Sequence, residues 1–85
     1  MKHASEKTLS SIKDVLKSIR QNKFLKEKKK GVFYKQSQAF IHFHEDLGGL
    51  FADLKTNNEW KRFPVNTRNE KEHFLKEAKK QTNVL

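Results

Sequence analysis

The sequence predicts an α+β fold: a small antiparallel sheet of three to four strands with two helices on one face, in the order α-β-β-β-α. Three observations lead to this prediction. Helical periodicity of apolar residues marks both ends of the chain, alternating apolar residues mark its centre, and turn-forming residues separate the central segments. The 85 residues suffice for a single domain, residues 1–85, whose core must draw on seven Phe, one Trp and one Tyr.

Residues 5–21 are predicted to form an amphipathic helix. Four aliphatic residues recur at spacings of three and four and so share one helical face: Leu9, Ile12, Leu16 and Ile19. Ser5 has the residue type of an N-cap, and Asn22 can close the helix. Residues 23–30 allow two interpretations, because Phe24 and Leu25 either pack against the helix or begin a short strand. Residues 28–31 are then predicted to form a turn that exposes basic side chains.

The centre of the chain predicts strands separated by polar or glycine-containing turns. The predicted strands are residues 32–35, 39–44, 50–55 and 60–63. Residues 36–38, 45–49 and 56–59 connect them. Pro64 is expected to end the last strand or to place it at the edge of the sheet, because proline cannot donate a ladder hydrogen bond.

Alternation along these strands predicts one covered and one open face of the sheet. The covered face is expected to carry the apolar sets Ala39, Ile41, Phe43 and Leu50, Ala52, Leu54. The open face is then expected to carry Phe40, His42, His44, Phe51 and Asp53. Either Trp60 and Arg62 or Lys61 and Phe63 join that open face, and the sequence leaves both alternatives standing.

Residues 67–80 are predicted to form the second helix. Thr67 and Glu70 have the spacing of a capping box, in which each side chain bonds the other residue's backbone N–H. Phe74, Leu75 and Ala78 give this helix a narrow apolar stripe. The terminal residues 1–4 and 81–85 are expected to fray.

The net charge of +9 is concentrated at one end of the sequence. Residues 1–30 contain ten Lys or Arg against three acidic residues, a net charge of +7. Such a patch attracts polyanions, including RNA, DNA, anionic lipid or an acidic protein. The alternative interpretation is a solubilising surface.

Several classes of protein do not fit the sequence. The chain has no cysteine, which excludes disulfides and thiolate zinc sites, and it has no apolar run long enough for a membrane span. No apolar stretch follows the basic N-terminus, so we expect no secretory signal and a cytoplasmic location. Phosphate-binding loops and common catalytic motifs are absent from the sequence, so an enzyme is the less favoured interpretation and no cofactor is predicted.

The open face predicts a nucleic-acid-binding site, with a lean towards RNA. Aromatic side chains on an uncovered sheet can stack unpaired bases, and lysines beside them can contact phosphates. The candidate residues are Phe40, His42, His44, Phe51, Trp60, Arg62, Lys28, Lys29 and Lys30. The alternative is that these aromatics are buried under a loop or in the interface of a homodimer or another protein complex.

His42 and His44 also allow a third interpretation. Two residues apart on a strand, their imidazoles share a face, and Asp53 on a neighbouring strand can join them. Two His and a carboxylate can bind zinc or iron, or can act as an acid–base pair in a hydrolase such as a ribonuclease. Against this, the two histidines can simply pack beside Phe40. No metal site is predicted.

Part of the sequence resembles small bacterial proteins of unassigned function, a resemblance that implies no activity. The resembling stretches are Gly31–Tyr34, Ala39–Asp46, Gly49–Leu54 and Arg62–Val65. The predicted element order also resembles double-stranded-RNA-binding domains and the small HicA-type toxins built on that fold. Those toxins carry a Gly-Ser-His element on an early strand. This sequence has none, and His42 lies in different surroundings.

Overall fold

The computed structural model of the chain describes residues 2–3 and 6–82. In chain order its elements are β1 (Lys2–His3), α1 (Glu6–Ser10), α2 (Lys13–Arg20), β2 (Leu25–Lys29), β3 (Val32–Lys35), β4 (Gln38–Asp46), β5 (Gly49–Thr56), β6 (Glu59–Pro64) and α3 (Arg68–Thr82). The α+β class and the antiparallel sheet are confirmed. The predicted order α-β-β-β-α and the prediction of three to four strands were slightly off. Residues 25–29 pair with β3, Lys2–His3 pair with β4, and the first helix is divided in two.

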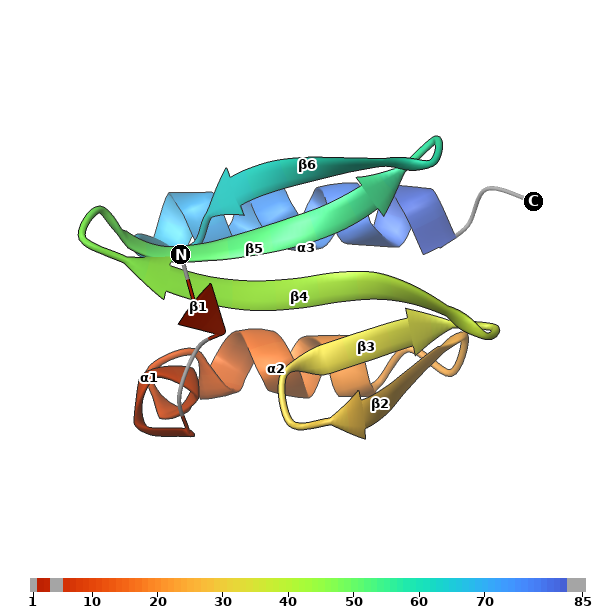
Figure 1. Cartoon of the computed structure of the whole chain (residues 1–85), viewed down its shortest axis with the longest axis horizontal. Coiled ribbons are helices and arrows are strands. Elements are labelled where there is room, and N and C mark those ends of the chain that lie inside the picture. The colour runs from red at the N-terminus through yellow and green to blue at the C-terminus, as the bar shows by residue number, and fades with distance from the viewer. Residues whose placement is uncertain (1, 4–5, 83–85) are drawn as a thin grey trace.

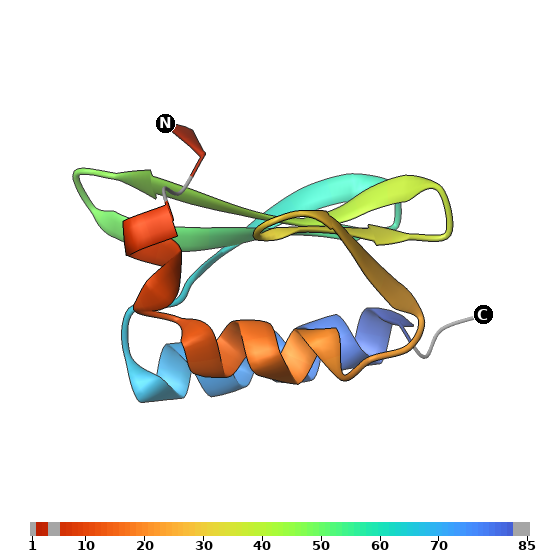
Figure 2. The same ribbon diagram turned by 90° about the horizontal axis from the view of Figure 1, so that it is seen from below.

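The sheet is a meander with the strand order β2-β3-β4-β5-β6, and every neighbouring pair is antiparallel. Strand β1 pairs with β4 at His44 and Glu45, beyond the point where the pairing of β3 with β4 ends. Helices α2 and α3 form a second layer on one face, and the other face of the meander carries no helix (Figures 1 and 2). None of the helices in the described ranges has the length and hydrophobicity needed to cross a bilayer.

The predicted first helix is broken into α1 and α2. Its four predicted apolar residues are all buried, so the expected face is correct, but the helix does not run continuously through Ser11 and Ile12. The hydroxyl groups of Ser10 and Ser11 donate to the carbonyls three residues earlier, each at 2.6 Å. These local bonds compete with helix geometry and explain the break. Ser5, the predicted N-cap, lies outside the described residues.

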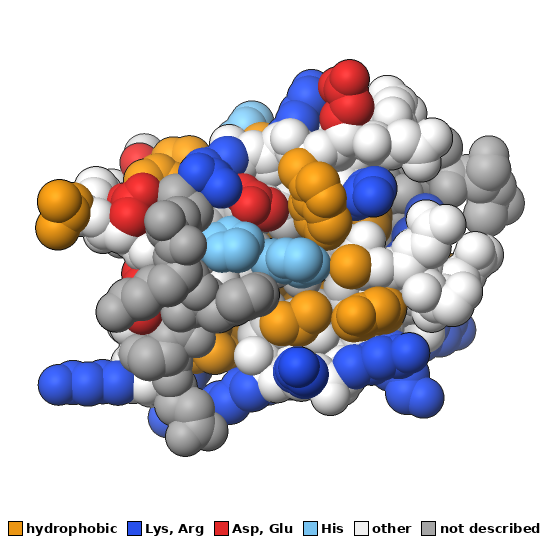
Figure 3. Space-filling view, viewed as in Figure 1, with side chains coloured by type: hydrophobic (Ala, Val, Ile, Leu, Met, Phe, Trp, Pro, Cys, Tyr) orange, Lys and Arg blue, Asp and Glu red, His pale blue; other side chains and the backbone are white. Residues whose placement is uncertain are grey.

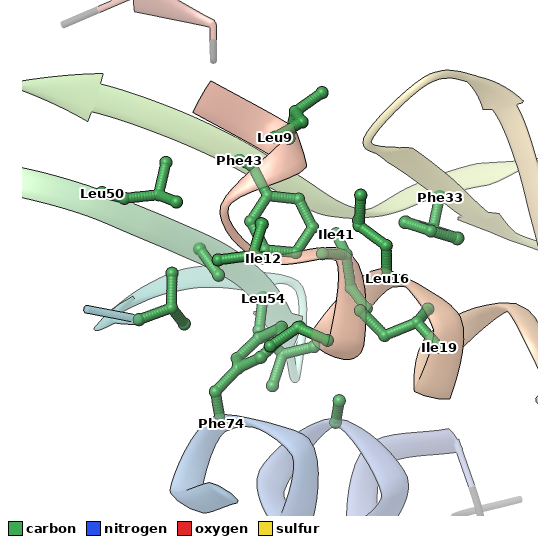
Figure 4. Close-up of a cluster of buried hydrophobic side chains, with 14 of the residues drawn as sticks. Leu9, Ile12, Leu16, Ile19, Phe33, Ile41, Phe43, Leu50, Leu54 and Phe74 are labelled. Carbon is green, nitrogen blue, oxygen red and sulfur yellow. The ribbon is translucent and has the colours of Figure 1, made fainter. Parts of the chain in front are cut away.

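The core lies between the sheet and the two-helix layer (Figure 4). Leu9, Ile12, Leu16 and Ile19 come from the helical side, and Phe33, Ile41, Phe43, Leu50 and Leu54 come from the sheet. Helix α3 contributes Phe74, whose ring centroid lies 6.0 Å from that of Phe43 and 5.8 Å from that of Phe63. These ring contacts tie α3 to β4 and β6 at the same point.

A bulge in β4 corrects the predicted faces at one position. Tyr34 pairs with Ala39 and Phe33 pairs with Ile41, so Phe40 is the extra residue on β4. Phe40 is 5% exposed, and the ammonium group of Lys35 lies 5.6 Å from its ring centroid and donates to the carbonyl of Gln81 in α3. The bulge therefore turns Phe40 towards the helical side and Ala39 towards the open face, the reverse of the simple alternation.

Helix α3 begins with the predicted capping box. The Glu70 amide donates to Thr67 Oγ1 at 3.1 Å, and Glu70 Oε1 accepts from the Thr67 amide at 3.0 Å. Backbone hydrogen bonds from Asn66 and Thr67 lower the pKa of the Glu70 carboxyl. The helix runs two residues past its predicted end, because Thr82 is buried and its hydroxyl accepts a hydrogen bond from the side-chain Nδ2 of Asn22 at 3.1 Å.

An ion pair joins α2 to the hairpin of β2 and β3. Arg20 Nε lies 2.6 Å from Glu27 Oε1, and Arg20 Nη2 lies 2.9 Å from Glu27 Oε2. The amide of Gly31 donates to the same carboxylate at 2.8 Å. The hydrogen bonds from Arg20, followed by that from Gly31, lower the pKa of Glu27 below its ordinary value of 4.5. This carboxylate therefore holds the β2–β3 turn and the end of α2 together.

We expect Glu27→Gln to lower the free energy of unfolding at pH 7 by about 1 kcal/mol, since water partly screens the exposed guanidinium of Arg20. A lowered folded-state pKa stabilises the protein above the ordinary pKa of 4.5 and loses this contribution as pH falls through the folded-state value. The variant and the native chain should therefore differ at neutral pH and converge in acid. Urea unfolding from pH 7 to pH 3 measures this.

The matched control for that experiment is Glu59→Gln. Glu59 is an exposed glutamate in β6 with no ion pair among the residues of ranges 2–3 and 6–82. It should change stability little at any pH. A constant difference between Glu27→Gln and the native chain across the whole pH range would contradict a role for the Glu27 charge.

Candidate nucleic-acid interface

The open face of the sheet is built from three rows of directly opposed residues. Side chains of such cross-strand partners lie on the same face. The central row is Val32, His42, Asp53 and Arg62, from β3 to β6. The row nearer the β4–β5 turn is His44, Phe51 and Pro64, and the row on the other side contains Lys26, Tyr34 and Ala39, with Lys55 and Trp60 further along. Figure 3 shows histidine side chains at the middle of this face, with hydrophobic side chains around them and Lys and Arg towards the periphery.

Asp53 is a buried carboxylate, and it organises one part of the central row. Arg62 binds it through two hydrogen bonds, Nε to Oδ1 at 2.9 Å and Nη2 to Oδ2 at 3.1 Å. His44 Nε2 lies 3.2 Å from Asp53 Oδ2. The carboxylate of Asp53 raises the pKa of the Arg62 guanidinium. The negative charge is thus offset within the sheet, so it does not cancel the attraction of the surrounding lysines for an anion.

Trp60 is the most exposed aromatic residue of the open face. Its side chain is 43% exposed although its ring packs on the sheet. The His42 ring centroid lies 4.6 Å from it on one side, and the ammonium group of Lys55 lies 5.1 Å from the ring centroid. These two neighbours hold the indole against the sheet, and its exposed part can contact a flat ligand.

Tyr34 forms a second aromatic–cation pair at the other side of the face. The ammonium group of Lys28 lies 4.7 Å from its ring centroid, and Lys26 is its cross-strand partner. Lys29 stands opposite Val32, so it belongs to the open face as well. Strand β2 therefore carries three lysines along the edge of the open face.

The structure brings most of the predicted site residues together, two of them lie elsewhere, and one is less exposed than predicted. His42, His44, Phe51, Trp60 and Arg62 share the open face, while Lys28 and Lys29 lie at its β2 edge. Lys30 lies in the β2–β3 turn beyond that edge. Phe51 is half-buried between His44 and Pro64 and offers less surface than predicted. Phe40 does not belong to the site, because the bulge turns it to the opposite face.

The structure also settles which residues of β6 join the open face. Trp60 and Arg62 do so, whereas Phe63 packs on Phe74 of α3. Sequence reasoning missed Tyr34, Lys26 and Lys55 as site residues. A signal for Lys26 exists in the alternation of Leu25, Lys26 and Glu27, but the lysine-rich composition of that segment hides it.

The arrangement does not favour the metal interpretation of His42, His44 and Asp53. In the part of the chain that the structure describes, no group of three or more His, Cys, Asp or Glu is placed to hold a metal ion. The rings of His42 and His44 lie 5.8 Å apart, centroid to centroid, and Asp53 is engaged by Arg62.

Comparisons of the chain with protein-family models, with curated proteins and with solved structures found no match.

Proposed function

We propose that this protein binds single-stranded nucleic acid, with a preference for RNA, across the open face of its sheet. One observation carries the proposal: two aromatic–cation pairs, Tyr34 with Lys28 and Trp60 with Lys55, stand on either side of His42. An aromatic ring offers a stacking surface for any base, and a neighbouring ammonium group can meet the phosphate of the same nucleotide.

The spacing of the two pairs fits an extended strand of nucleic acid. Tyr34 lies on β3 and Trp60 on β6, three strand positions apart, which corresponds to about 14 Å. Two bases stacked on these rings would be separated by a few nucleotides, with the intervening bases over Val32, Ala39 and His42. A single strand can bind across a sheet in this way because its bases are unpaired and free to stack on the protein. RNA-recognition sheets use aromatic side chains as the stacking platforms.

The charges around the face support the same proposal. The lysines of β2 form a cationic edge, and Lys55 adds positive charge on β5. Asp53 is neutralised by Arg62, and Asp46 accepts a bond from the Gly48 amide at the tip of the β4–β5 turn. A backbone crossing the sheet would therefore meet mainly cations.

We expect a labelled single-stranded RNA to bind with an affinity that falls steeply with salt, and more tightly than the matching duplex. Fluorescence anisotropy with single-stranded RNA, single-stranded DNA and duplexes, titrated at several salt concentrations, measures this. Replacing Lys28 and Lys29 by alanine should make the slope of log affinity against log salt shallower by about 1.4, or about 0.7 for each phosphate that is no longer neutralised.

The matched control removes the same charge from a remote surface. Lys76→Ala with Lys80→Ala changes two exposed lysines of α3, which lie in the helical layer and not on the open face. This double variant should keep the native salt slope. An equal decrease in both double variants would mean that the lysines act only as general charge, and binding that does not depend on salt would contradict the proposal.

A self-association module is the second candidate, because Trp60 is exposed at the edge strand β6. That edge also carries Lys61, Arg62 and Pro64, residue types that discourage the pairing of edge strands. Sedimentation equilibrium separates the two candidates. A dimer that RNA dissociates would indicate that both ligands compete for the open face, and a monomer would leave only the nucleic-acid proposal.

A further inference from the structure

The helical layer carries an apolar groove that is separate from the open face. A hollow of about 500 Å³ lies between the end of α2, the following connection and the second half of α3. Its apolar lining consists of Ile19, Phe24, Leu25, Leu75 and Ala78. Ile19 and Ala78 are buried, whereas Phe24 is 58% exposed. An exposed phenylalanine beside a buried apolar floor leaves hydrophobic area that a partner can cover.

A second hollow extends this groove along α3. It has a volume of about 340 Å³, and Leu75 and Lys79 line both hollows. Its other lining residues are Glu72 and Lys76, so the groove follows one stripe of α3 with helical spacing. From residue 72 to residue 79 this stripe is about 10 Å long, the length of about two helical turns.

The rim of the groove is positively charged. Lys23, Lys76 and Lys79 line the two hollows, all three are exposed, and none has an ion pair among residues 2–3 and 6–82. Among the described residues that line the two hollows, Glu72 is the one carboxylate, and Arg68 lies 3.5 Å from it. The rim thus lacks the negative charge that would balance its lysines.

We propose that this groove binds an acidic amphipathic helix of a partner protein. The partner would place an apolar stripe, with spacings of three and four residues, over Leu75 and against Phe24. Its Glu or Asp side chains would meet Lys23, Lys76 and Lys79. This is the helix-in-groove mode of recognition, in which the apolar area gives affinity and the charges select the partner. The groove is lined mainly by residues of α2, of the connection after it and of α3. Both helices lie on the other side of the sheet from the open face (Figure 2), so the proposal does not rest on nucleic-acid binding.

The test uses the full chain, labelled with ¹⁵N, and a designed peptide probe of about four helical turns. The probe carries leucines at positions i, i+3, i+4 and i+7 and glutamates on its remaining face. One control peptide has the same composition in scrambled order, and another has lysine in place of glutamate. We expect the probe alone to shift the amide signals of residues 19–25 and 72–79, and to leave those of Tyr34 and Trp60 unchanged.

Variants of the protein sharpen this test. Phe24→Ala removes an exposed anchor with little risk to folding and should weaken binding of the probe at least about tenfold. Lys23→Glu with Lys79→Glu should weaken it as well and should favour the lysine peptide instead. Trp60→Ala is the matched control, because it removes an exposed aromatic residue from the open face and should leave the affinity for the probe unchanged.

Four outcomes would overturn the proposal. They are equal binding of the scrambled peptide, shifts confined to the open face, full affinity in Phe24→Ala, and no binding of the probe at all. Two other occupants have their own signatures. Shifts at residues 19–25 that grow with protein concentration alone would assign the groove to a second copy of the chain, and shifts there on adding RNA would assign it to nucleic acid. Failure of RNA binding leaves the peptide result unaffected.

Discussion

Replacing Phe74 by alanine is expected to lower the free energy of unfolding by about 3–5 kcal/mol, the usual cost of deleting a fully buried phenylalanine. Phe74 is 0% exposed and contacts both Phe43 on β4 and Phe63 on β6. The truncation removes both ring contacts and leaves a cavity under the centre of the sheet. A domain of this length has a total stability of about 4–13 kcal/mol, so a large share of it depends on this one side chain.

Urea unfolding followed by circular dichroism and by the fluorescence of Trp60 measures this effect. Phe24→Ala is the matched control, because it deletes the same group from an exposed position and should change stability by no more than about 0.5 kcal/mol. If Phe74→Ala lowered the free energy of unfolding as little as Phe24→Ala, α3 would not be packed on the sheet as described.

Replacing Trp60 by alanine is expected to weaken the binding of single-stranded RNA about 5–150-fold, which corresponds to the 1–3 kcal/mol of one stacked base. The indole is the most exposed ring of the open face, and His42 and Lys55 hold it in place. Fluorescence anisotropy at fixed salt measures the change. Because the lysines remain, the salt dependence should stay close to that of the native chain.

Two further variants control for a loss of structure. Trp60→Phe retains a stacking ring and should recover most of the affinity, and Phe24→Ala removes an aromatic residue on the helical side and should have no effect on RNA. Full affinity in Trp60→Ala would exclude stacking on β6, and equal decreases in Trp60→Ala and Phe24→Ala would point to a general effect on the fold.

Residue spacing was sufficient to predict the elements in which apolar periodicity is strong. The stripe of Leu9, Ile12, Leu16 and Ile19 and the capping box of Thr67 and Glu70 lie in the structure as expected, because both depend on local geometry alone. The break at Ser10 and Ser11 was missed because serine hydroxyl groups can either tolerate or interrupt a helix. Strand β2 was left ambiguous because lysine is a poor strand former, and tertiary pairing with β3 overrides that preference.

The composition of the open face was predictable wherever the alternation of strands is regular. His42, His44 and Phe51 follow the rule, and Trp60 and Arg62 resolve the alternative that the sequence left open. Phe40 breaks the rule because one extra residue in β4 reverses the direction of its side chain. A bulge depends on how two strands meet in space, and nothing in the sequence around Ala39 distinguishes it from a regular strand.

The meander of β2 to β6 also affects how the chain can fold as it is synthesised. Each of these strands pairs with its neighbour in sequence, so little loop-closure entropy opposes the formation of successive hairpins. The two helices that cover the core are far apart in sequence, because α2 precedes the five strands of the meander and α3 follows them. On the ribosome, the side of the sheet that carries Ile41, Phe43 and Leu54 must stay partly uncovered until α3 has emerged. During that interval the nascent chain is most exposed to aggregation and to capture by chaperones.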